Sequence, residues 1–318
     1  MTLTKFAKLA HVSVSTASKA FSMSGDINEK TREEIFRIAR ENGCFKQFFN
    51  APYPHFVIGV IIPEFNSFLY ADYVENIQRA LKEKGCEICV SATDFSAEKE
   101  RELIEYFYKY STVDGLILVS PREDPGAIEL PTVLISKQEP EDACVINSSG
   151  DEEQIKTAME YLAAKGVSSV GFVGEKRSDD RHRNFRATAQ EVFGNVQEDL
   201  IEMGGLRFEK GGYAGMEALF EKGKVPRAVF CAYDYMAIGA MKCIRDHGLR
   251  VPQDVAVVGF DNISQDPFLD PPLASISQDR RTICRHAAEQ VINRILGKPF
   301  EKLILVPSEF HHRESFEI

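Results

Sequence analysis

The chain has 318 residues, of which 27% are charged and 44% hydrophobic, and it carries a formal net charge of −10 at pH 7. This length allows more than one hydrophobic core, so two or three domains are expected. No apolar run approaches the length that crosses a bilayer, and the N-terminal stretch lacks the core of a signal peptide, which predicts a cytoplasmic protein with no membrane partner. The seven scattered cysteines are typical of reduced, buried thiols and argue against a disulfide framework.

The charge is unevenly distributed along the chain. Residues 1–50 contain eight Lys or Arg and five acidic residues, a balance of +3, whereas the remainder contains 30 basic and 43 acidic residues, a balance of −13. A small basic module on a large acidic body is expected when only one end of a protein approaches a polyanion.

Three short helices are predicted within the first fifty residues, because apolar side chains recur there at helical spacing. They are Phe6, Ala7, Leu9 and Ala10, then Val14, Ala17, Ala20 and Phe21, then Ile35, Phe36, Ile38 and Ala39. Ser13 and Asn28 are placed to cap the second and third helices, and Gly43 to end the third. Only residues 11–13 separate the first two helices, the length of a helix-turn-helix connection, and His11 tolerates left-handed backbone better than most residues.

The second helix has a polar face that predicts contact with double-stranded DNA. In a helix-turn-helix this helix lies in the major groove, with its N-terminal residues at the base edges. Val14, Ser15 and Lys19 would then face bases. Thr16 and Ser18 would suit phosphates. The alternative is an ordinary surface helix, since Ser and Thr are common on solvated faces.

A linker of residues 47–56 follows this headpiece, which spans residues 1–46. Pro52 and Pro54 lie where a helix would need amide donors, so no regular hinge helix is expected. Phe48 or Phe49 could insert between base steps as an apolar wedge. Alternatively, the two rings pack against the headpiece or the body.

From residue 57 onward, apolar runs of strand length alternate with amphipathic helices. The predicted strands are 57–62, 87–92, 115–120, 132–136, 169–174, 228–232, 255–260 and 303–307, and the predicted helices include 73–85, 152–166, 213–223, 235–248 and 280–297. Continuous apolar strands separated by helices indicate parallel sheets covered on both faces. The number of strands favours two such sheets in an α/β body.

Ligands in parallel α/β sheets bind beyond the carboxyl ends of the strands. The turns at those ends carry Phe68, Tyr70, Arg181, Tyr233 and Asp261. An arginine fork and a carboxylate can share neighbouring hydroxyls, and aromatic rings cover the C–H face of a sugar, so a small carbohydrate effector is predicted. The charges crowded into residues 179–186 could instead indicate an anionic effector, or simply a solvated loop.

The sequence gives no sign of an enzyme. It has no G-x-G-x-x-G, Walker or G-x-S-x-G motif, so no catalytic residue and no cofactor is predicted. Cys86 and Cys89 have redox spacing, but they enter a predicted strand and have no second pair for zinc. His311 and His312 lack clustered partners, and no metal site is predicted.

Several motifs in chain order resemble the lactose/galactose repressor (LacI/GalR) family. K-L-A-H-V-S-V-S-T-A-S-K-A-F at 8–21 and I-N-E-K-T-R-E-E-I at 27–35 are similar to its headpiece. The landmarks of the body are V-D-G-L-I-L at 113–118, C-A-Y-D-Y-M-A-I-G-A at 231–240, G-L-R-V-P-Q-D-V-A-V-V-G-F-D-N at 248–262, P-P-L-A-S-I-S-Q-D at 271–279 and R-E-S at 313–315.

The resemblance implies a helix-turn-helix headpiece on a periplasmic-binding-protein-like core of two lobes, residues 57–318, with the effector in the cleft between them. The first lobe would be about 57–147 plus 278–306, and the second about 148–277 plus 307–318. Arg181 and Asp261 fall on the effector-binding Arg and Asp of the family. The implied function is a homodimeric, ligand-controlled repressor, with helices 73–84 and 235–247 in the dimer contact.

The sequence departs from the family pattern at positions that bear on specificity. His11 replaces the usual turn Gly, Lys19 the usual Arg, and Tyr233 the usual Asn. Lysine cannot make the two-pronged contact that arginine makes to guanine, so the operator preference does not transfer. Two rival functions remain, a cytoplasmic sugar-binding protein without DNA function and a carbohydrate-active enzyme that uses the same cleft.

Overall fold

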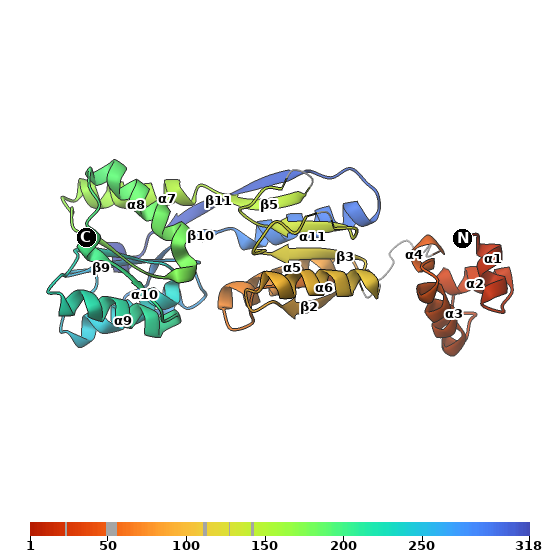
Figure 1. Ribbon diagram of the computed structural model, residues 1–318. Coiled ribbons are helices and arrows are strands. Elements are labelled where there is room, and N and C mark those ends of the chain that lie inside the picture. Colours follow the sequence, from red (N-terminus) through yellow and green to blue (C-terminus); the bar gives the residue numbers. More distant parts are fainter. Residues whose placement is uncertain (23, 49–55, 111–112, 127, 141–142) are drawn as a thin grey trace. The chain divides into compact units, whose positions relative to one another are not determined.

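The computed structural model describes residues 1–318 except residues 23, 49–55, 111–112, 127 and 141–142 (Figure 1). The chain divides into two compact units. The first comprises Met1–Ile146 and Cys284–Ile304, and the second Asn147–Ile283 and Leu305–Ile318. Within the described residues, no helix is both long and apolar enough to span a membrane.

The N-terminal segment contains helices α1 (Leu3–Leu9), α2 (Val14–Phe21) and α3 (Glu29–Glu41), and a single turn, α4 (Phe45–Phe48). The predicted caps are confirmed: the Ser13 hydroxyl accepts the Thr16 amide proton at 2.9 Å, and the Asn28 side chain accepts from the Lys30 amide at 2.9 Å. His11, in the turn between α1 and α2, has a φ of 53°. A residue other than glycine therefore occupies the left-handed turn position, as the sequence predicted.

Phenylalanine rings pack together in the headpiece core. The ring centroid of Phe48 lies 5.3 Å from that of Phe6 and 5.5 Å from that of Phe21, and Phe48 is 8% exposed. Of the two alternatives for Phe48, packing against the headpiece is therefore confirmed. Phe49 and both linker prolines lie outside the described residues.

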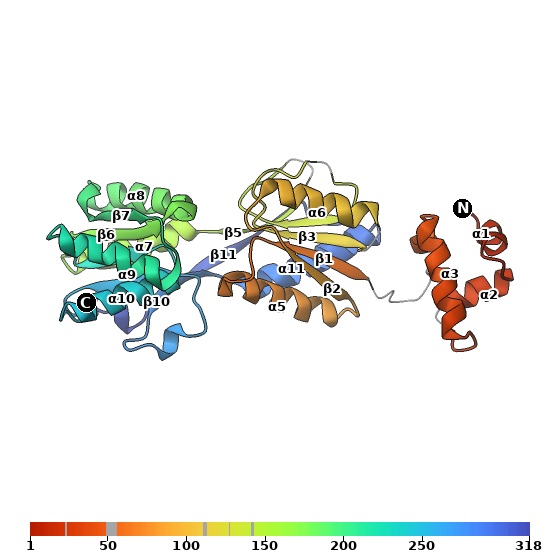
Figure 2. The same cartoon turned by 60° about the horizontal axis from the view of Figure 1, so that its bottom comes forward.

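The first unit contains a parallel sheet in the order β2-β1-β3-β4-β5. Its strands are β1 (Val57–Ile62), β2 (Glu87–Ala92), β3 (Gly115–Val119), β4 (Thr132–Ile135) and β5 (Cys144–Ser149), the last of which continues into the second unit. Helix α6 (Ala97–Lys109) covers one face, and α5 (Phe68–Lys82) and α11 (Arg280–Ile295) cover the other (Figure 2).

The alternation of side chains along β3 accounts for these two layers. Leu116 and Leu118 pack in one cluster with Phe107 of α6. The opposite face of the strand meets α11: a Cβ on Gly115 would lie only 2.9 Å from Val291 of that helix. Because both faces are covered, the strand is apolar throughout, as is typical of a buried parallel sheet.

The second unit contains a sheet in the order β7-β6-β8-β9-β10-β11. The strands are β6 (Val170–Glu175), β7 (Ile201–Gly204), β8 (Ala228–Cys231), β9 (Ala256–Phe260), β10 (Ala274–Gln278) and β11 (Leu303–His311), the first two residues of which belong to the first unit. All described pairs are parallel except β10 with β11. The predicted α/β class with parallel sheets is confirmed.

Four long helices cover this sheet, α7 and α8 on one face and α9 and α10 on the other (Figures 1 and 2). They are α7 (Asp151–Ala164), α8 (Asp179–Phe193), α9 (Phe208–Glu221) and α10 (Asp234–Asp246). Short 3-10 turns complete the fold: η1 (Lys176–Ser178), η2 (Glu198–Leu200), η3 (Asp266–Phe268) and η4 (Glu314–Phe316).

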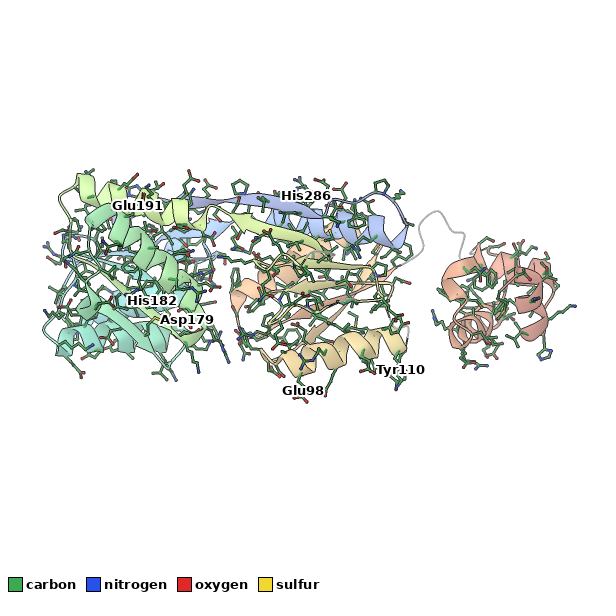
Figure 3. All side chains as sticks on the ribbon, turned by 45° about the horizontal axis from the view of Figure 1, so that its top comes forward. Glu98, Tyr110, Asp179, His182, Glu191 and His286 are labelled. Carbon is green, nitrogen blue, oxygen red and sulfur yellow. The ribbon has the colours of Figure 1, made fainter. Side chains whose placement is uncertain are left out.

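Several elements were missed from the sequence. The strands β5, β7 and β10 are short or contain polar residues, so they lack the continuous apolar run that identified the others. The interpretation of residues 179–186 as a solvated loop is wrong, because Asp179, His182 and Glu191 lie along helix α8 (Figure 3). This helix buries Phe185 against the core while the ion pair between Arg183 and Asp180 stays exposed.

The boundary between the units also differs from the predicted lobe boundary. Residues 278–283 were assigned to the first lobe but lie in the second unit. Their contacts explain the difference: the Gln278 amide donates to the Ser148 hydroxyl at 2.7 Å, and the Arg280 guanidinium donates to the Asp261 carbonyl at 2.5 Å. All four of these residues belong to the second unit.

Candidate effector site and candidate DNA interface

The turn after β9 has a constrained backbone. Asp261 and Asn262 have φ values of 99° and 47°, a region that residues with a Cβ rarely adopt and that clusters at functional sites. The Asp261 amide donates to the Ile276 carbonyl at 2.8 Å, and the Asn262 amide donates to the Ser275 hydroxyl at 2.9 Å. These bonds to β10 hold the Asp261 carboxylate in one direction.

Arg181, in the first turn of α8, pairs with this carboxylate. One guanidinium nitrogen donates to Asp261 Oδ1 at 2.6 Å, and the other donates to the Ala232 carbonyl at 2.5 Å. The guanidinium carbon also lies 4.9 Å from the ring centroid of Phe260. The two charged side chains are 23% and 12% exposed, so the pair is mostly withdrawn from water but still accessible. Two residues that are 80 positions apart in the sequence are thus brought into direct contact.

Tyr233 is the N-cap residue of α10 and directly follows Ala232, whose carbonyl accepts the hydrogen bond from Arg181. Its hydroxyl accepts the Phe208 amide proton at 3.0 Å, and the two rings are 6.1 Å apart in an edge contact. Burial raises the pKa of Tyr233, so the phenol stays neutral. The hydroxyl is therefore engaged by the first residue of α9, and the ring is the part of Tyr233 left to line a site.

Two buried carboxyl groups lie beneath the turn. Asp234 and Asp266 are both fully buried. Asp234 accepts the Ile263 amide proton at 3.0 Å and the Ser275 hydroxyl proton at 2.7 Å, and so connects α10 to the turn and to β10. Burial, reinforced by the charge of Asp266, raises the pKa of Asp234, and burial raises the pKa of Asp266 to about 6. These groups support the site without forming its surface.

Arg313 is a supporting residue that the sequence analysis did not assign to the site. Its guanidinium donates to the Asn262 side-chain oxygen at 2.6 Å and to the Leu273 carbonyl at 2.6 Å. The sequence did mark this residue, because Arg313 begins the R-E-S motif near the C-terminus. Only the fold places that motif beside a turn 51 residues earlier.

The other two predicted effector residues belong to the first unit. Phe68 and Tyr70 lie in the first turn of α5 and are half-buried. Tyr70 makes an edge contact with Phe95, at a centroid distance of 6.2 Å. Their assignment to the same effector as Arg181 stays a prediction.

The predicted DNA-contacting residues lie on one side of α2. Ala17, Ala20 and Phe21 are buried in the headpiece, whereas four of the five predicted contact residues are exposed and Thr16 is half-buried. The exposed four are Val14, Ser15, Ser18 and Lys19. Val14 is 43% exposed, so an apolar side chain is also accessible on this side of the helix. The Lys19 ammonium lies 3.3 Å from Asp26.

The chain is similar to a known domain family and to several curated transcriptional regulators. The sequence profile of the periplasmic binding protein-like domain matches residues 159–316. The HTH-type transcriptional regulator DegA of Bacillus subtilis is 25% identical, with 96% of this chain and 95% of DegA aligned. The repressor CytR of Escherichia coli is 26% identical, with 93% and 90% aligned, and the ribose operon repressor of Haemophilus influenzae is 24% identical, with 96% of each chain aligned.

The curated relatives are LacI-family transcriptional regulators, and this chain is similar to them over nearly its full length. Solved structures agree on the fold of the chain. The Lac repressor dimer bound to operator superimposes with a TM-score of 0.73 at 23% identity over 99% of both chains, and a CelR–cellobiose complex with a TM-score of 0.70 at 24% identity over 99% of both. The relatives are transcriptional regulators and not enzymes, which agrees with the prediction that the chain is not an enzyme.

Proposed function

We propose that this regulator is a homodimeric repressor, acting in the cytoplasm, that binds duplex operator DNA through α2 and is controlled by a small carbohydrate held by Arg181 and Asp261. The observation that carries the effector assignment is the Arg181–Asp261 pair over the Phe260 ring, at the carboxyl end of β9. The ribose operon repressor among the relatives supports a sugar or a related polyol.

The chemistry of the pair suits vicinal hydroxyl groups. A guanidinium has five N–H donors, and the bonds to Asp261 and Ala232 use two of them. The carboxylate accepts hydrogen bonds through two oxygens, so neighbouring hydroxyls of a ligand can donate to Asp261 while accepting from Arg181. The ring of Tyr233 supplies the apolar surface that a sugar's C–H face requires.

The proposed DNA contact follows from the exposed face of α2. Ser15, Ser18 and Lys19 can donate to phosphates or base edges, and Val14 can contact a thymine methyl group. Lys19 would leave Asp26, an exposed partner whose attraction is weak in water, for the stronger field of the duplex. Two headpieces related by the dimer axis would read two half-sites.

The DNA part is tested by fluorescence anisotropy with a duplex taken from the regulator's own promoter region. Affinity should fall steeply between about 50 and 200 mM salt, because each neutralised phosphate releases a counterion. Lys19→Ala should weaken binding by roughly 1–2 kcal/mol and lower the salt slope by about 1. The matched control is Arg37→Ala, since Arg37 is exposed on α3 and paired within its own helix with Glu34 and Glu41. Absence of duplex binding at low salt would contradict the repressor and favour a sugar-binding protein.

The effector part is tested by thermal shift with a panel of pentoses, hexoses and disaccharides. A ligand at 100 times its dissociation constant adds about 2.7 kcal/mol to stability. Arg181→Ala should lose this response. Arg183→Ala, two residues along the same helix but exposed and paired with Asp180, should keep it. Equal responses in the two variants would show that the effector site is misplaced.

A further inference from the structure

Helices α9 and α10 of the second unit are held in backbone contact. A Cβ on Gly212 would lie 1.8 Å from the Met236 carbonyl oxygen, and one on Gly239 would lie 1.9 Å from the Glu209 carbonyl oxygen. Only glycine allows two helices to approach so closely. Side chains further along the two helices are therefore presented to each other at a fixed separation.

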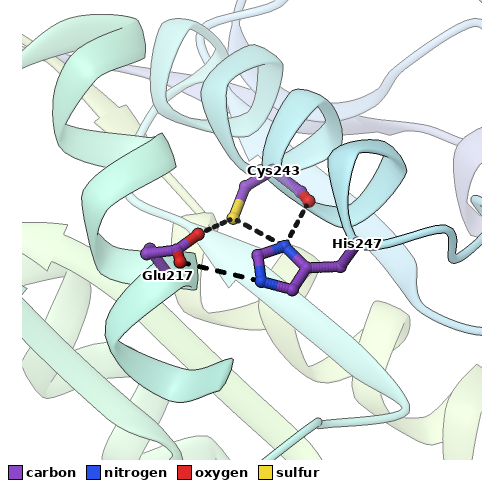
Figure 4. Close-up of side chains that lie close together, drawn as sticks. All are labelled: Glu217, Cys243 and His247. Carbon is purple, nitrogen blue, oxygen red and sulfur yellow. Dashed lines mark hydrogen bonds and ion pairs between the residues drawn. The ribbon is translucent and has the colours of Figure 1, made fainter. Parts of the chain in front are cut away.

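Three potential metal ligands meet near the C-terminal ends of these helices (Figure 4). Cys243 lies on α10 and His247, four residues later, is the C-cap residue of that helix, so the two side chains lie on one face, while Glu217 comes from α9. Cys243 Sγ lies 3.3 Å from one Glu217 carboxylate oxygen, and His247 Nε2 lies 3.6 Å from the other. The ligand atoms of all three are within 4.8 Å of one another, the single group of this kind in the described part of the chain.

The imidazole is oriented by its second nitrogen. Nδ1 of His247 lies 3.0 Å from the Cys243 backbone carbonyl, to which it can donate a proton. In the neutral ring this bond leaves the Nε2 lone pair on the side of Glu217, the tautomer that metal-binding histidines adopt when a carbonyl holds the other nitrogen. The Phe220 ring stacks on the imidazole at 4.1 Å and 14° and fixes its plane.

We propose that Glu217, Cys243 and His247 bind one divalent transition-metal ion of the zinc type. A lone pair on Nε2 facing a carboxylate oxygen is stable only with a proton or a cation between them, and the Cys243 sulfur lies 3.3 Å from the other oxygen of the same carboxylate. Thiolate, imidazole and carboxylate are the three ligand types of zinc sites, whereas magnesium and calcium select oxygen. The two anionic ligands neutralise the ion.

The surroundings suit an ion that exchanges with solvent. The Glu217 and His247 side chains are 37% and 35% exposed, whereas Cys243 is buried, so the site is open on one side. Three protein ligands leave a fourth tetrahedral position for water. Because one ligand comes from α9 and the other two from α10 and its C-cap residue, the ion would tie the two helices together and resist their separation.

Binding requires a balanced proton step. Burial, together with the hydrogen bond to Glu217, raises the pKa of Cys243 to about 12, so the free thiol is protonated near neutrality. The S–H bond breaks, a sulfur–metal bond forms, and one proton passes to the buffer for each ion bound. Affinity should therefore fall as the pH is lowered.

The experiment uses the untagged full chain, stripped with a chelator and titrated with Co²⁺ as the probe. One equivalent should produce a thiolate-to-cobalt absorption band that Zn²⁺ then removes, and Zn²⁺ should raise the melting temperature of the chain. Cys243→Ala should abolish the band. Cys89→Ala, which changes an exposed free cysteine on β2, should retain it.

A second variant separates ligation from folding. His247→Gln changes a partly exposed side chain, so the protein should unfold at nearly the parental temperature in chelator while its affinity for Co²⁺ falls at least about tenfold. The proposal is overturned if no band saturates at one equivalent, or if the band survives Cys243→Ala. It is equally overturned if His247→Gln binds Co²⁺ as tightly as the parent.

Discussion

Replacement of Arg181 by Met tests whether the Arg181–Asp261 pair is a structural element of the second unit as well as a site for ligand. Met has similar length and fills similar space but cannot donate. The change removes two hydrogen bonds from a charged donor, of about 1.5–3 kcal/mol each when buried. It also leaves the Asp261 carboxylate, only 12% exposed, without its cation.

The Arg181 side chain is 23% exposed, so in the variant water can replace part of the lost hydrogen bonding to Asp261 and Ala232. We therefore expect about 3 kcal/mol of destabilisation, near the lower end of the range for breaking a buried pair. The second unit has roughly 150 residues, a size for which 1 kcal/mol shifts the melting temperature by about 2–4 °C. The expected decrease is about 6–12 °C for the transition of that unit.

Differential scanning calorimetry of the full chain measures this shift, and a double-mutant cycle with Asp261→Asn isolates the pair. Asparagine tolerates the positive φ of residue 261 better than most residues do, so the second change mainly removes the charge. The two effects should be non-additive by at least about 1.5 kcal/mol. The reasoning is refuted if Arg181→Met lowers the melting temperature by less than about 2 °C, or if the two changes simply add.

Three further predictions concern the packing and the pH dependence of stability. Gly212→Ala should destabilise the second unit by more than about 3 kcal/mol, because the added Cβ would overlap the Met236 carbonyl. Gly205→Ala is the control, since a Cβ there would have nothing within 4 Å, and it should change the stability by no more than about 0.5 kcal/mol. Urea denaturation measures both changes in stability, and equal losses would contradict the close approach of the helices. Asp266 has a folded pKa raised to about 6, so its contribution to stability is present below pH 4 and is lost as the pH rises through 6. Asp266→Asn should remove about 2–3 kcal/mol of the change in unfolding free energy with pH. Parallel curves of stability against pH for the variant and the parent would contradict this role of Asp266. Phe48→Ala should cost the headpiece about 3 kcal/mol, because the ring is 8% exposed and packs on two others, and an unchanged headpiece melting curve by circular dichroism would place the ring outside the core.

The elements predicted correctly from the sequence are those with a strong local signal. The caps Ser13 and Asn28 and the left-handed His11 were predicted because each depends on the chemistry of one or two neighbouring residues. Strands such as β1 and β9 were found because they are buried on both faces and are therefore apolar throughout.

The elements that were missed have weak local signals. The sequence of α8 is rich in charged residues, and only a few of its side chains, Phe185, Thr188 and Ala189, are buried. Strand β10 is only five residues long and contains two serines, yet both are buried, because Ser275 bonds to Asp234 and Ser277 lies 2.9 Å from His311. In β10, hydrogen-bond partners from distant parts of the chain allow polar side chains to be buried, and the local sequence does not reveal those partners.

By itself, the sequence determined the helix-turn-helix segment, the α/β class and the identity of Arg181 and Asp261 as candidate ligand-binding residues, because periodicity and motif order are properties of neighbouring positions. Only the tertiary structure decided that Arg181 contacts Asp261, that Arg313 supports the same turn, and that Glu217 meets Cys243 and His247. Each of these contacts joins residues that are 26 to 80 positions apart. They depend on how the strands are ordered and how closely α9 approaches α10, and those distances are set by packing of the whole unit.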